Sequence, residues 1–86
     1  MYKVEVFVTY KESILDPQGE AIKGAVGRMG YTDIAEIRQG KYFEILVASD
    51  DEAHVAAEIE AISDKLLANV VMESYRYNIQ KVEVEA

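Results

Sequence analysis

Apolar and polar residues alternate through the first ten positions, and a period of two is typical of a β-strand that buries one face. Phe7 interrupts this alternation because it falls on the polar side. Two explanations stay open for Phe7: cover by a loop of the same chain, or burial against a second subunit. The face expected to be buried consists of Tyr2, Val4, Val6, Val8 and Tyr10. The polar side consists of Lys3, Glu5 and Thr9.

A helical pattern follows, and Asp16 and Pro17 mark its start. A carboxylate is a good acceptor for the free N–H groups of a first helical turn. Proline fits the first helical position because its missing N–H costs nothing there. The pattern predicts a helix over residues 17 to about 29, ended by Gly30. The expected core face of this helix consists of Ile22, Ala25, Val26 and Met29.

Gly24 and Gly27 lie inside this predicted helix, each at a cost of about 1 kcal/mol relative to alanine. They are one helical turn apart. Either another backbone approaches the helix closely at these glycines, or they simply face solvent.

Two strands are expected next, over residues 34–38 and 42–48. Between them, Gln39, Gly40 and Lys41 are few enough for a hairpin turn, in which Gly40 is free to take a positive φ. A second helix is predicted to open at Ser49, since Glu52 three residues later completes a capping-box pattern. This helix is expected to run to about residue 68, with apolar residues at helical spacing: Val55, Ile59, Ile62 and Leu66.

The last strand carries Tyr75, Tyr77 and Ile79 on one face, but Val82 and Val84 fall in the opposite register. A bulge near residues 80–81 explains this shift, and so does a tail that pairs outside its own sheet. The resulting order, β-α-β-β-α-β, predicts an α+β, ferredoxin-like two-layer sandwich. In that fold a four-stranded antiparallel sheet has both helices on one face.

Composition narrows the possible partners and settings. The 86 residues make one domain, and sixteen acidic against nine basic residues give a net charge of −7. This balance argues against nucleic acid or a membrane surface as a partner. The absence of cysteine excludes disulfides and thiol nucleophiles. The strand-like start carries no leader pattern, and no apolar run approaches a membrane span, so a cytoplasmic location is expected.

Candidate chemistry is sparse. His54 is the single histidine, so it cannot build an ordinary zinc site or a nucleophile–base pair, and we expect it to face solvent. Asp50, Asp51 and Glu52 could suggest magnesium, but acidic residues also stabilise a helix N-terminus, and capping is the stronger explanation. The glycines form no phosphate-binding motif. The sequence therefore predicts no catalytic, metal or cofactor-binding residue in this chain.

Four segments together resemble one protein family over nearly the whole chain. They are ILDPQGEAI at residues 14–22, GY at 30–31, IRQGKYFE at 37–44 and KLLANVVMESY at 65–75. The chain is similar to the PurS family, the small subunits of bacterial and archaeal phosphoribosylformylglycinamidine synthase. It departs from the family pattern at Val70, where proline is usual, and at Ser74, where aspartate or a similar polar residue is common.

The resemblance implies a non-catalytic subunit of a ligase in purine biosynthesis. That enzyme converts formylglycinamide ribonucleotide, ATP and glutamine to the amidine. A glutaminase subunit releases ammonia, and a large synthetase subunit binds ATP and magnesium. The small subunit is expected to bridge these two partners, to support ammonia transfer, and to form a homodimer or a dimer of dimers.

Two sets of contact residues are predicted from these considerations. One set, near the expected hairpin and last strand, is expected to touch the larger subunits: Arg38, Gly40, Lys41, Asn69, Glu73 and Arg76. The other set is expected at contacts between copies of the chain: Phe7, Val82 and Val84.

The main alternative function is a regulatory module similar to ACT domains, which share the βαββαβ order and bind amino acids at a dimer interface. Such a domain should carry a glycine in its first loop. Here the first glycine comes only at Gly19, inside the predicted helix, which counts against this alternative.

Overall fold

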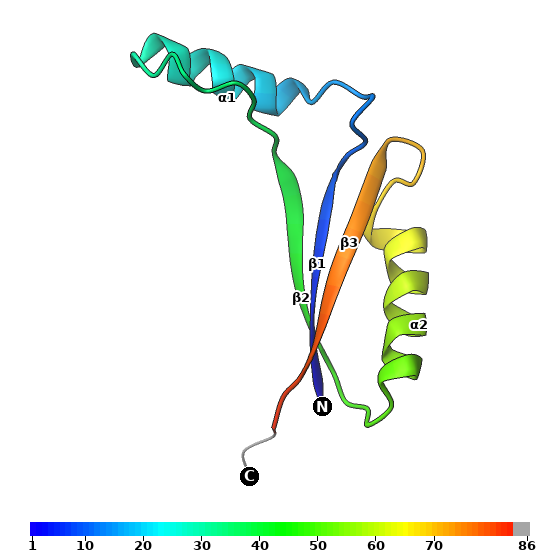
Figure 1. Ribbon diagram of the computed structural model, residues 1–86. Coiled ribbons are helices and arrows are strands. Elements are labelled where there is room, and N and C mark those ends of the chain that lie inside the picture. Colours follow the sequence, from blue (N-terminus) through cyan, green and yellow to red (C-terminus); the bar gives the residue numbers. More distant parts are fainter. Residues whose placement is uncertain (84–86) are drawn as a thin grey trace.

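The computed structural model describes residues 1–83, in which three strands form one antiparallel sheet (Figure 1). The strand order is β2-β1-β3, so the first strand is central. The elements in chain order are β1 (Tyr2–Tyr10), α1 (Pro17–Arg28), β2 (Gly40–Val47), α2 (Glu52–Ile62), the π-helical turn η1 (Ser63–Leu67) and β3 (Glu73–Lys81).

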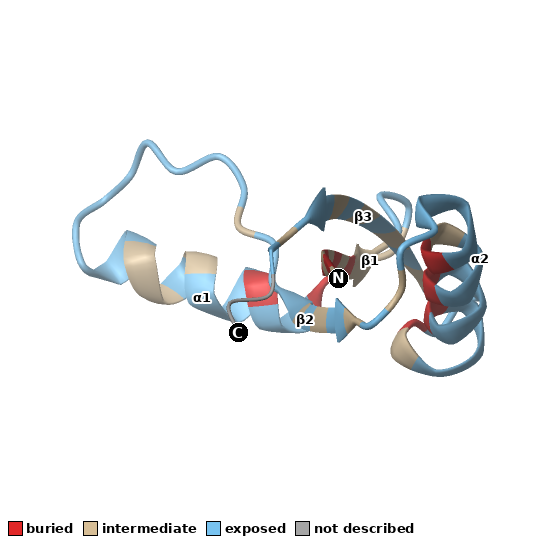
Figure 2. Cartoon of the chain, turned by 90° about the horizontal axis from the view of Figure 1, so that it is seen from below, coloured by how far each residue is buried: buried red, intermediate tan, exposed pale blue. Residues whose placement is uncertain are grey.

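The core lies between β1 and α2 (Figure 2). Val4, Val6 and Val8 of β1 are fully buried, which confirms the predicted face of the first strand. Val55 and Ile59 of α2 cover them and are also fully buried. Each such side chain contributes about 1.5–3 kcal/mol through burial. Apolar residues of β2 and β3 complete this face but are only partly buried: Phe43, Ile45, Val47, Tyr75, Tyr77 and Ile79.

The predicted four-stranded sheet is wrong for the part of the chain that the structure describes. Residues 34–38, expected to form a strand, have no regular secondary structure. The hairpin expected at residues 39–41 is also absent, because Gly40 and Lys41 already belong to β2 and pair with Thr9 and Val8. The chain therefore reaches β2 from the far end of α1 without pairing along the outer edge of β2.

A carboxylate explains why the hairpin does not form. Asp16 caps α1 as predicted, with Oδ1 accepting a hydrogen bond from the Gly19 N–H at 3.0 Å. Its Oδ2 accepts a second bond, at 2.7 Å, from the N–H of Gln39. The bonds from Gly19 and Gln39 hold the pKa of Asp16 below its usual value. Residue 39 is thus fastened to the start of α1 and cannot turn back along β2.

The expected core face of α1 is not in the core. Gly19 is the only buried residue of this helix, while Ile22 is 42% exposed and Met29 is 70% exposed. Figure 1 shows the reason, since α1 extends sideways from one end of the sheet while α2 runs beside it. The two helices therefore do not share one face of the sheet, contrary to the ferredoxin-like prediction.

The end of α1 agrees with the sequence prediction. Gly30 follows the helix with a φ of 99°, a conformation that favours glycine. Apart from the helix's own backbone, no backbone atom lies within 4 Å of the place a Cβ would take at Gly24 or Gly27. Close approach of another part of the described chain is therefore not the reason for these two glycines.

The second helix is confirmed, but its start and its buried face differ from the prediction. The Asp51 carboxylate, not Ser49, caps it, accepting bonds from the N–H groups of residues 53 and 54. Ile62 and Leu66 are exposed, because the buried face runs through Ser63. The Ala68 N–H bonds back five residues to the Ser63 carbonyl, and this π-type turn brings Leu67 onto the core in place of Leu66.

The last strand has no bulge near residues 80–81. Its pairing with β1 continues without interruption from Glu73 to Lys81, and the Val82 N–H then bonds to the Met1 carbonyl. Val82 keeps the strand's alternation and lies on the side opposite Tyr77 and Ile79. Val84 lies outside the described residues.

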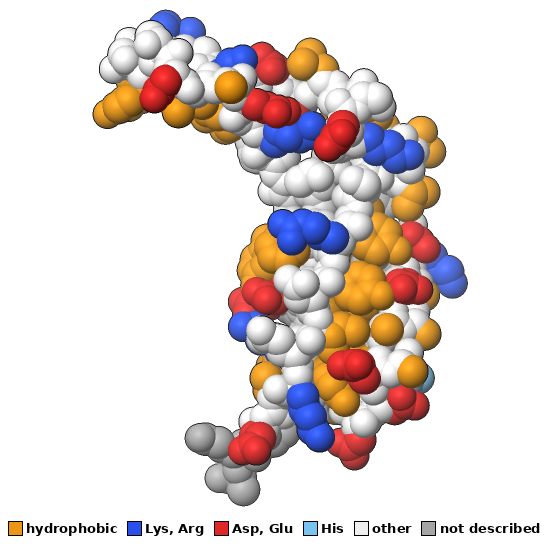
Figure 3. Space-filling model, viewed as in Figure 1, with side chains coloured by type: hydrophobic (Ala, Val, Ile, Leu, Met, Phe, Trp, Pro, Cys, Tyr) orange, Lys and Arg blue, Asp and Glu red, His pale blue; other side chains and the backbone are white. Residues whose placement is uncertain are grey.

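The chain is elongated, measuring 50 × 31 × 15 Å. Its radius of gyration is 16.8 Å, whereas a compact domain of this length has about 12 Å. The projecting helix accounts for the difference, and apolar side chains gather along its lower side in Figure 3.

Two glycines of α1 allow a matched test of the Asp16 junction. A Cβ at Gly19 would lie 2.3 Å from the Ile37 carbonyl oxygen, whereas a Cβ at Gly27 would have nothing within 4 Å. We expect Gly19→Ala to lower the free energy of unfolding by about 1–3 kcal/mol. Gly27→Ala should leave it unchanged or raise it by up to about 1 kcal/mol. Urea unfolding of both variants measures this, and equal effects would contradict the close approach at Gly19.

Candidate functional site

The residues predicted to contact partner proteins fall into two groups in space. Arg38, Lys41, Asn69 and Glu73 lie at the end of the sheet nearest α1. Arg76 lies on the face of the sheet opposite α2, which we call the open face because no described element covers it. Gly40 belongs to the pairing of β1 with β2, since a Cβ there would lie 2.3 Å from the Val8 carbonyl oxygen.

The first group forms a network that holds one loop. Lys41 Nζ donates to the Leu67 carbonyl at 2.9 Å and lies 3.4 Å from Oε1 of Glu73. The same Glu73 oxygen accepts a hydrogen bond of 2.8 Å from the Asn69 N–H. Lys41 thus reaches from β2 across β1 to the connection between η1 and β3. Three of the predicted contact residues, Lys41, Asn69 and Glu73, are thus brought together and bind one another.

The loop held by this network presents an apolar tip. Asn69 Oδ1 accepts a bond of 3.1 Å from the Val71 N–H, and the Asn69 carbonyl accepts one of 3.0 Å from Met72. Val71 is nevertheless 76% exposed, and Val70 and Met72 are 47% and 41% exposed. An apolar loop that is ordered yet exposed is suited to contact another protein.

Arg38 serves a neighbouring junction. Its guanidinium donates to the Tyr10 carbonyl and lies 3.5 Å from Glu36. The Lys11 N–H bonds to the Met72 carbonyl at 3.0 Å, which joins the end of β1 to the exposed loop. Arg38 therefore lies close to the loop network but does not belong to it.

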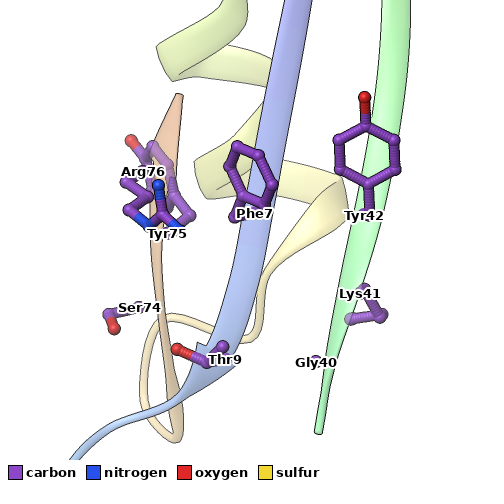
Figure 4. A pocket seen from close by; sticks show the side chains of 8 residues that line it. All are labelled: Phe7, Thr9, Gly40, Lys41, Tyr42, Ser74, Tyr75 and Arg76. Atoms are coloured by element: carbon purple, nitrogen blue, oxygen red, sulfur yellow. The ribbon is translucent and has the colours of Figure 1, made fainter. Parts of the chain in front are cut away.

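On the open face, the structure joins two residues that the sequence assigned to different surfaces. The guanidinium carbon of Arg76 lies 4.2 Å from the ring centre of Phe7, and the Tyr42 ring centre lies 5.1 Å from it on the other side (Figure 4). Within residues 1–83, the side chains that flank Phe7 are Arg76 and Tyr42 of the neighbouring strands. The burial of Phe7 against a second subunit stays a prediction, as do the contacts of Val82 and Val84.

Tyr42 and Glu5 also belong to this face, although sequence reasoning did not select them. The Tyr42 hydroxyl donates a hydrogen bond of 2.7 Å to Glu5, and this bond raises the pKa of Tyr42 to about 12. Lys3 pairs with Glu44 at 2.8 Å on the same face. The alternation along β2 could have revealed Tyr42 from the sequence, because it places Tyr42 and Phe43 on opposite faces of the sheet.

The structure allows a search of residues 1–83 for a metal site, an unpaired histidine and a membrane-spanning helix. In residues 1–83, no three histidine, cysteine or acidic side chains gather closely enough to hold a metal ion. The lone His54 is exposed, as predicted, and pairs with Glu58 at 2.9 Å. Neither described helix has the length and apolar character needed to cross a membrane. The surfaces described above offer aromatic, apolar and charged side chains that can bind another protein.

Comparison with known proteins identifies the family. A sequence profile for PurS, described as phosphoribosylformylglycinamidine (FGAM) synthase, matches residues 3–81. The chain belongs to the PurS family. A relative from Bacillus subtilis, named phosphoribosylformylglycinamidine synthase subunit PurS, is 43% identical over 82 residues, which cover 95% of this chain and 96% of the relative.

Solved PurS structures share the fold. The crystal structure of Methanocaldococcus jannaschii PurS, one of the subunits of formylglycinamide ribonucleotide amidotransferase, matches with a TM-score of 0.87 at 32% identity, over 96% of this chain and all of that one. A chain in the structure of PurLQS from Thermotoga maritima matches with a TM-score of 0.84 at 23% identity, over 92% and 96% of the two chains. The α+β fold of this chain, with two helices and one sheet, is thus shared with solved PurS structures.

The loop network of this PurS chain gives a local prediction. Lys41→Ala should lower the free energy of unfolding by about 1 kcal/mol, because half of the Lys41 side chain is exposed and its Nζ lies as far as 3.4 Å from Glu73. The N–H groups of residues 69 and 71 should nevertheless exchange with solvent faster, since Lys41 no longer holds the Glu73 carboxylate that accepts the Asn69 N–H. Hydrogen exchange followed by NMR measures both amides. Lys23→Ala on α1 is the control, and unchanged exchange in Lys41→Ala would contradict the role of the network.

Proposed function

We propose that this chain is the small subunit of a multi-subunit phosphoribosylformylglycinamidine synthase, acting in purine biosynthesis in the cytoplasm. The observation that carries the proposal is the PurS match over residues 3–81, on a chain whose described residues offer binding surfaces and no catalytic group. The enzyme uses ATP and glutamine to convert formylglycinamide ribonucleotide to the amidine. ATP and magnesium belong to the large synthetase subunit, and glutamine to a separate glutaminase subunit.

In this proposal the small subunit bridges the two larger ones and supports the passage of ammonia between them. Ammonia that escapes into water near neutral pH becomes ammonium and is no longer a nucleophile. A dry path between two active sites prevents this loss, and it needs shape and burial but no reactive side chain. The ordered apolar loop at Val71 and the aromatic open face around Phe7 are surfaces of the required kind. No observation favours amino-acid binding, so the ACT-like alternative is set aside.

The exposed area supports a homo-oligomer. The chain exposes 6254 Å², about 1,100 Å² more than the roughly 5,100 Å² expected of a compact monomer of 9.7 kDa. A stable interface buries about 800 Å² on each partner. The excess is therefore of the size that one interface would cover.

The α1 helix is the part that needs such cover. No other element of the described chain covers its apolar face, on which Ile22 and Met29 are exposed. On the core side of the sheet, α2 leaves Ile45 and Val47 of β2 only partly buried. We propose that α1 of one copy covers this part of the sheet in a second copy. Each sheet would then have two helices on one face, as in a ferredoxin-like sandwich, with α2 from its own chain and α1 from the other chain.

Reconstitution tests the function. Amidine formation from glutamine is assayed with the glutaminase and synthetase subunits of the same organism, with and without this chain. We expect the glutamine-dependent rate to fall strongly when the chain is left out. The rate with added ammonia should fall less, because free ammonia bypasses the transfer. An equal glutamine-dependent rate in both assays would exclude the proposed role, and so would amidine formation by the chain alone.

Sedimentation tests the homo-oligomer. Ile22→Glu places a charge on the apolar face of α1 and should shift the chain towards monomer. Gly27→Glu adds the same charge where nothing lies within 4 Å, so it should keep the wild-type mass. A wild-type chain that is monomeric at micromolar concentration would exclude the proposal, and equal masses for both variants would exclude α1 as its contact.

A further inference from the structure

The open face of the sheet carries one cation without an ion pair among the described residues. Lys3 and Glu44 pair at 2.8 Å, and Glu5 accepts the Tyr42 hydroxyl bond at 2.7 Å. The remaining charged group of this face is Arg76. Within residues 1–83, its guanidinium has no ion pair and no hydrogen bond, so its donors are free to bind another molecule.

This guanidinium is nevertheless held in place. It stacks on Phe7 at 4.2 Å, and the Phe7 ring is itself supported by Tyr42 on the neighbouring strand. A cation over an aromatic ring is attracted to the ring face, and it keeps the N–H groups at its edge available. An arginine that is already ordered loses less conformational entropy when a partner binds. Arginine and aromatic residues are also the types that dominate binding energy at protein interfaces.

A hollow lies beside this stack (Figure 4). Its volume is about 310 Å³, and the small residues Thr9, Gly40 and Ser74 line the part away from the rings. Gly40 has to remain without a side chain, since a Cβ would lie 2.3 Å from the Val8 carbonyl oxygen and 2.8 Å from Thr9 Cγ2. The pairing of β1 with β2 therefore requires glycine at position 40, and no side chain from this position can fill the hollow.

We propose that the open face binds a segment of the large synthetase subunit, with one carboxylate of that segment paired to Arg76. A neighbouring side chain of the same segment occupies the hollow. This inference rests on the proposed function and identifies one contact within it. A carboxylate suits the free donors of a guanidinium, which it can engage through two parallel hydrogen bonds.

The charges on the face favour a carboxylate over a phosphate. Glu5 and Glu44 lie on the same face as Arg76, and the chain has a net charge of −7. The four charged side chains of this face, Lys3, Glu5, Glu44 and Arg76, sum to zero, so a multiply charged phosphate would leave more uncompensated negative charge there than a carboxylate. A single carboxylate, on a protein that also buries Phe7 and Tyr42, complements the charges of the open face better than a phosphate does.

The test measures the dissociation constant between this chain and the synthetase subunit of the same organism by biolayer interferometry. Arg76→Gln should weaken binding roughly 30-fold, as expected for a central interface arginine. Arg76→Lys should recover only part of this loss, because lysine lacks the planar guanidinium. Lys81→Gln removes the same charge from the same strand outside the hollow, so it should stay within about twofold of wild type. Circular dichroism confirms that each variant is folded.

The outcomes separate this inference from the proposed function. If wild type and Arg76→Gln bind the synthetase subunit equally, the contact at Arg76 is excluded while the proposed function stands. If Arg76→Gln keeps that affinity but lowers the mass of the free chain in sedimentation, the open face joins copies of the chain, and the inference is wrong. If the wild-type chain binds neither larger subunit, the proposed function fails as well.

Discussion

The shape of this chain depends on two hydrogen bonds to one carboxylate. Asp16 accepts one from the start of α1 and one from residue 39, just before β2. Gly19 lets the two segments approach, since any side chain there would meet the Ile37 carbonyl. With both segments fastened at one point, α1 and the chain that returns from it leave the sheet together. A hairpin before β2 would have required residue 39 to be released.

This junction divides the molecule into a part that is packed and a part that is not. The sheet and α2 bury a continuous row of valine and isoleucine side chains, which is sufficient for a local core. The α1 helix buries only Gly19 and leaves its apolar face in solvent. Small domains that cannot cover their own apolar surface commonly depend on partners. The elongated shape and the PurS family membership are consistent with a chain that works inside a larger assembly.

The binding surfaces follow from the same arrangement. Because α1 does not lie on the sheet, and α2 covers one face only, the open face keeps Phe7 and Arg76 accessible. The exposed loop at Val71 is fixed by hydrogen bonds at its base, where the Asn69 side chain accepts from the Val71 N–H and Lys41 donates to the Leu67 carbonyl. Binding surfaces of this kind carry their specificity in shape and in a few polar groups.

The sequence by itself determined the elements whose signals are local. The alternation in β1, the cap at Asp16 and the stop at Gly30 depend on neighbouring residues, and all three were predicted correctly. What only the tertiary structure decided involves distant residues. The hydrogen bond that the Gln39 N–H donates to Asp16 spans 23 positions, and the segment before it, residues 34–38, does not form the expected strand. The stacking of Arg76 on Phe7 required the register of β1 with β3. Periodicity shows which side chains share a face, but it does not show which face another element covers, because that depends on where the connecting segments are fastened.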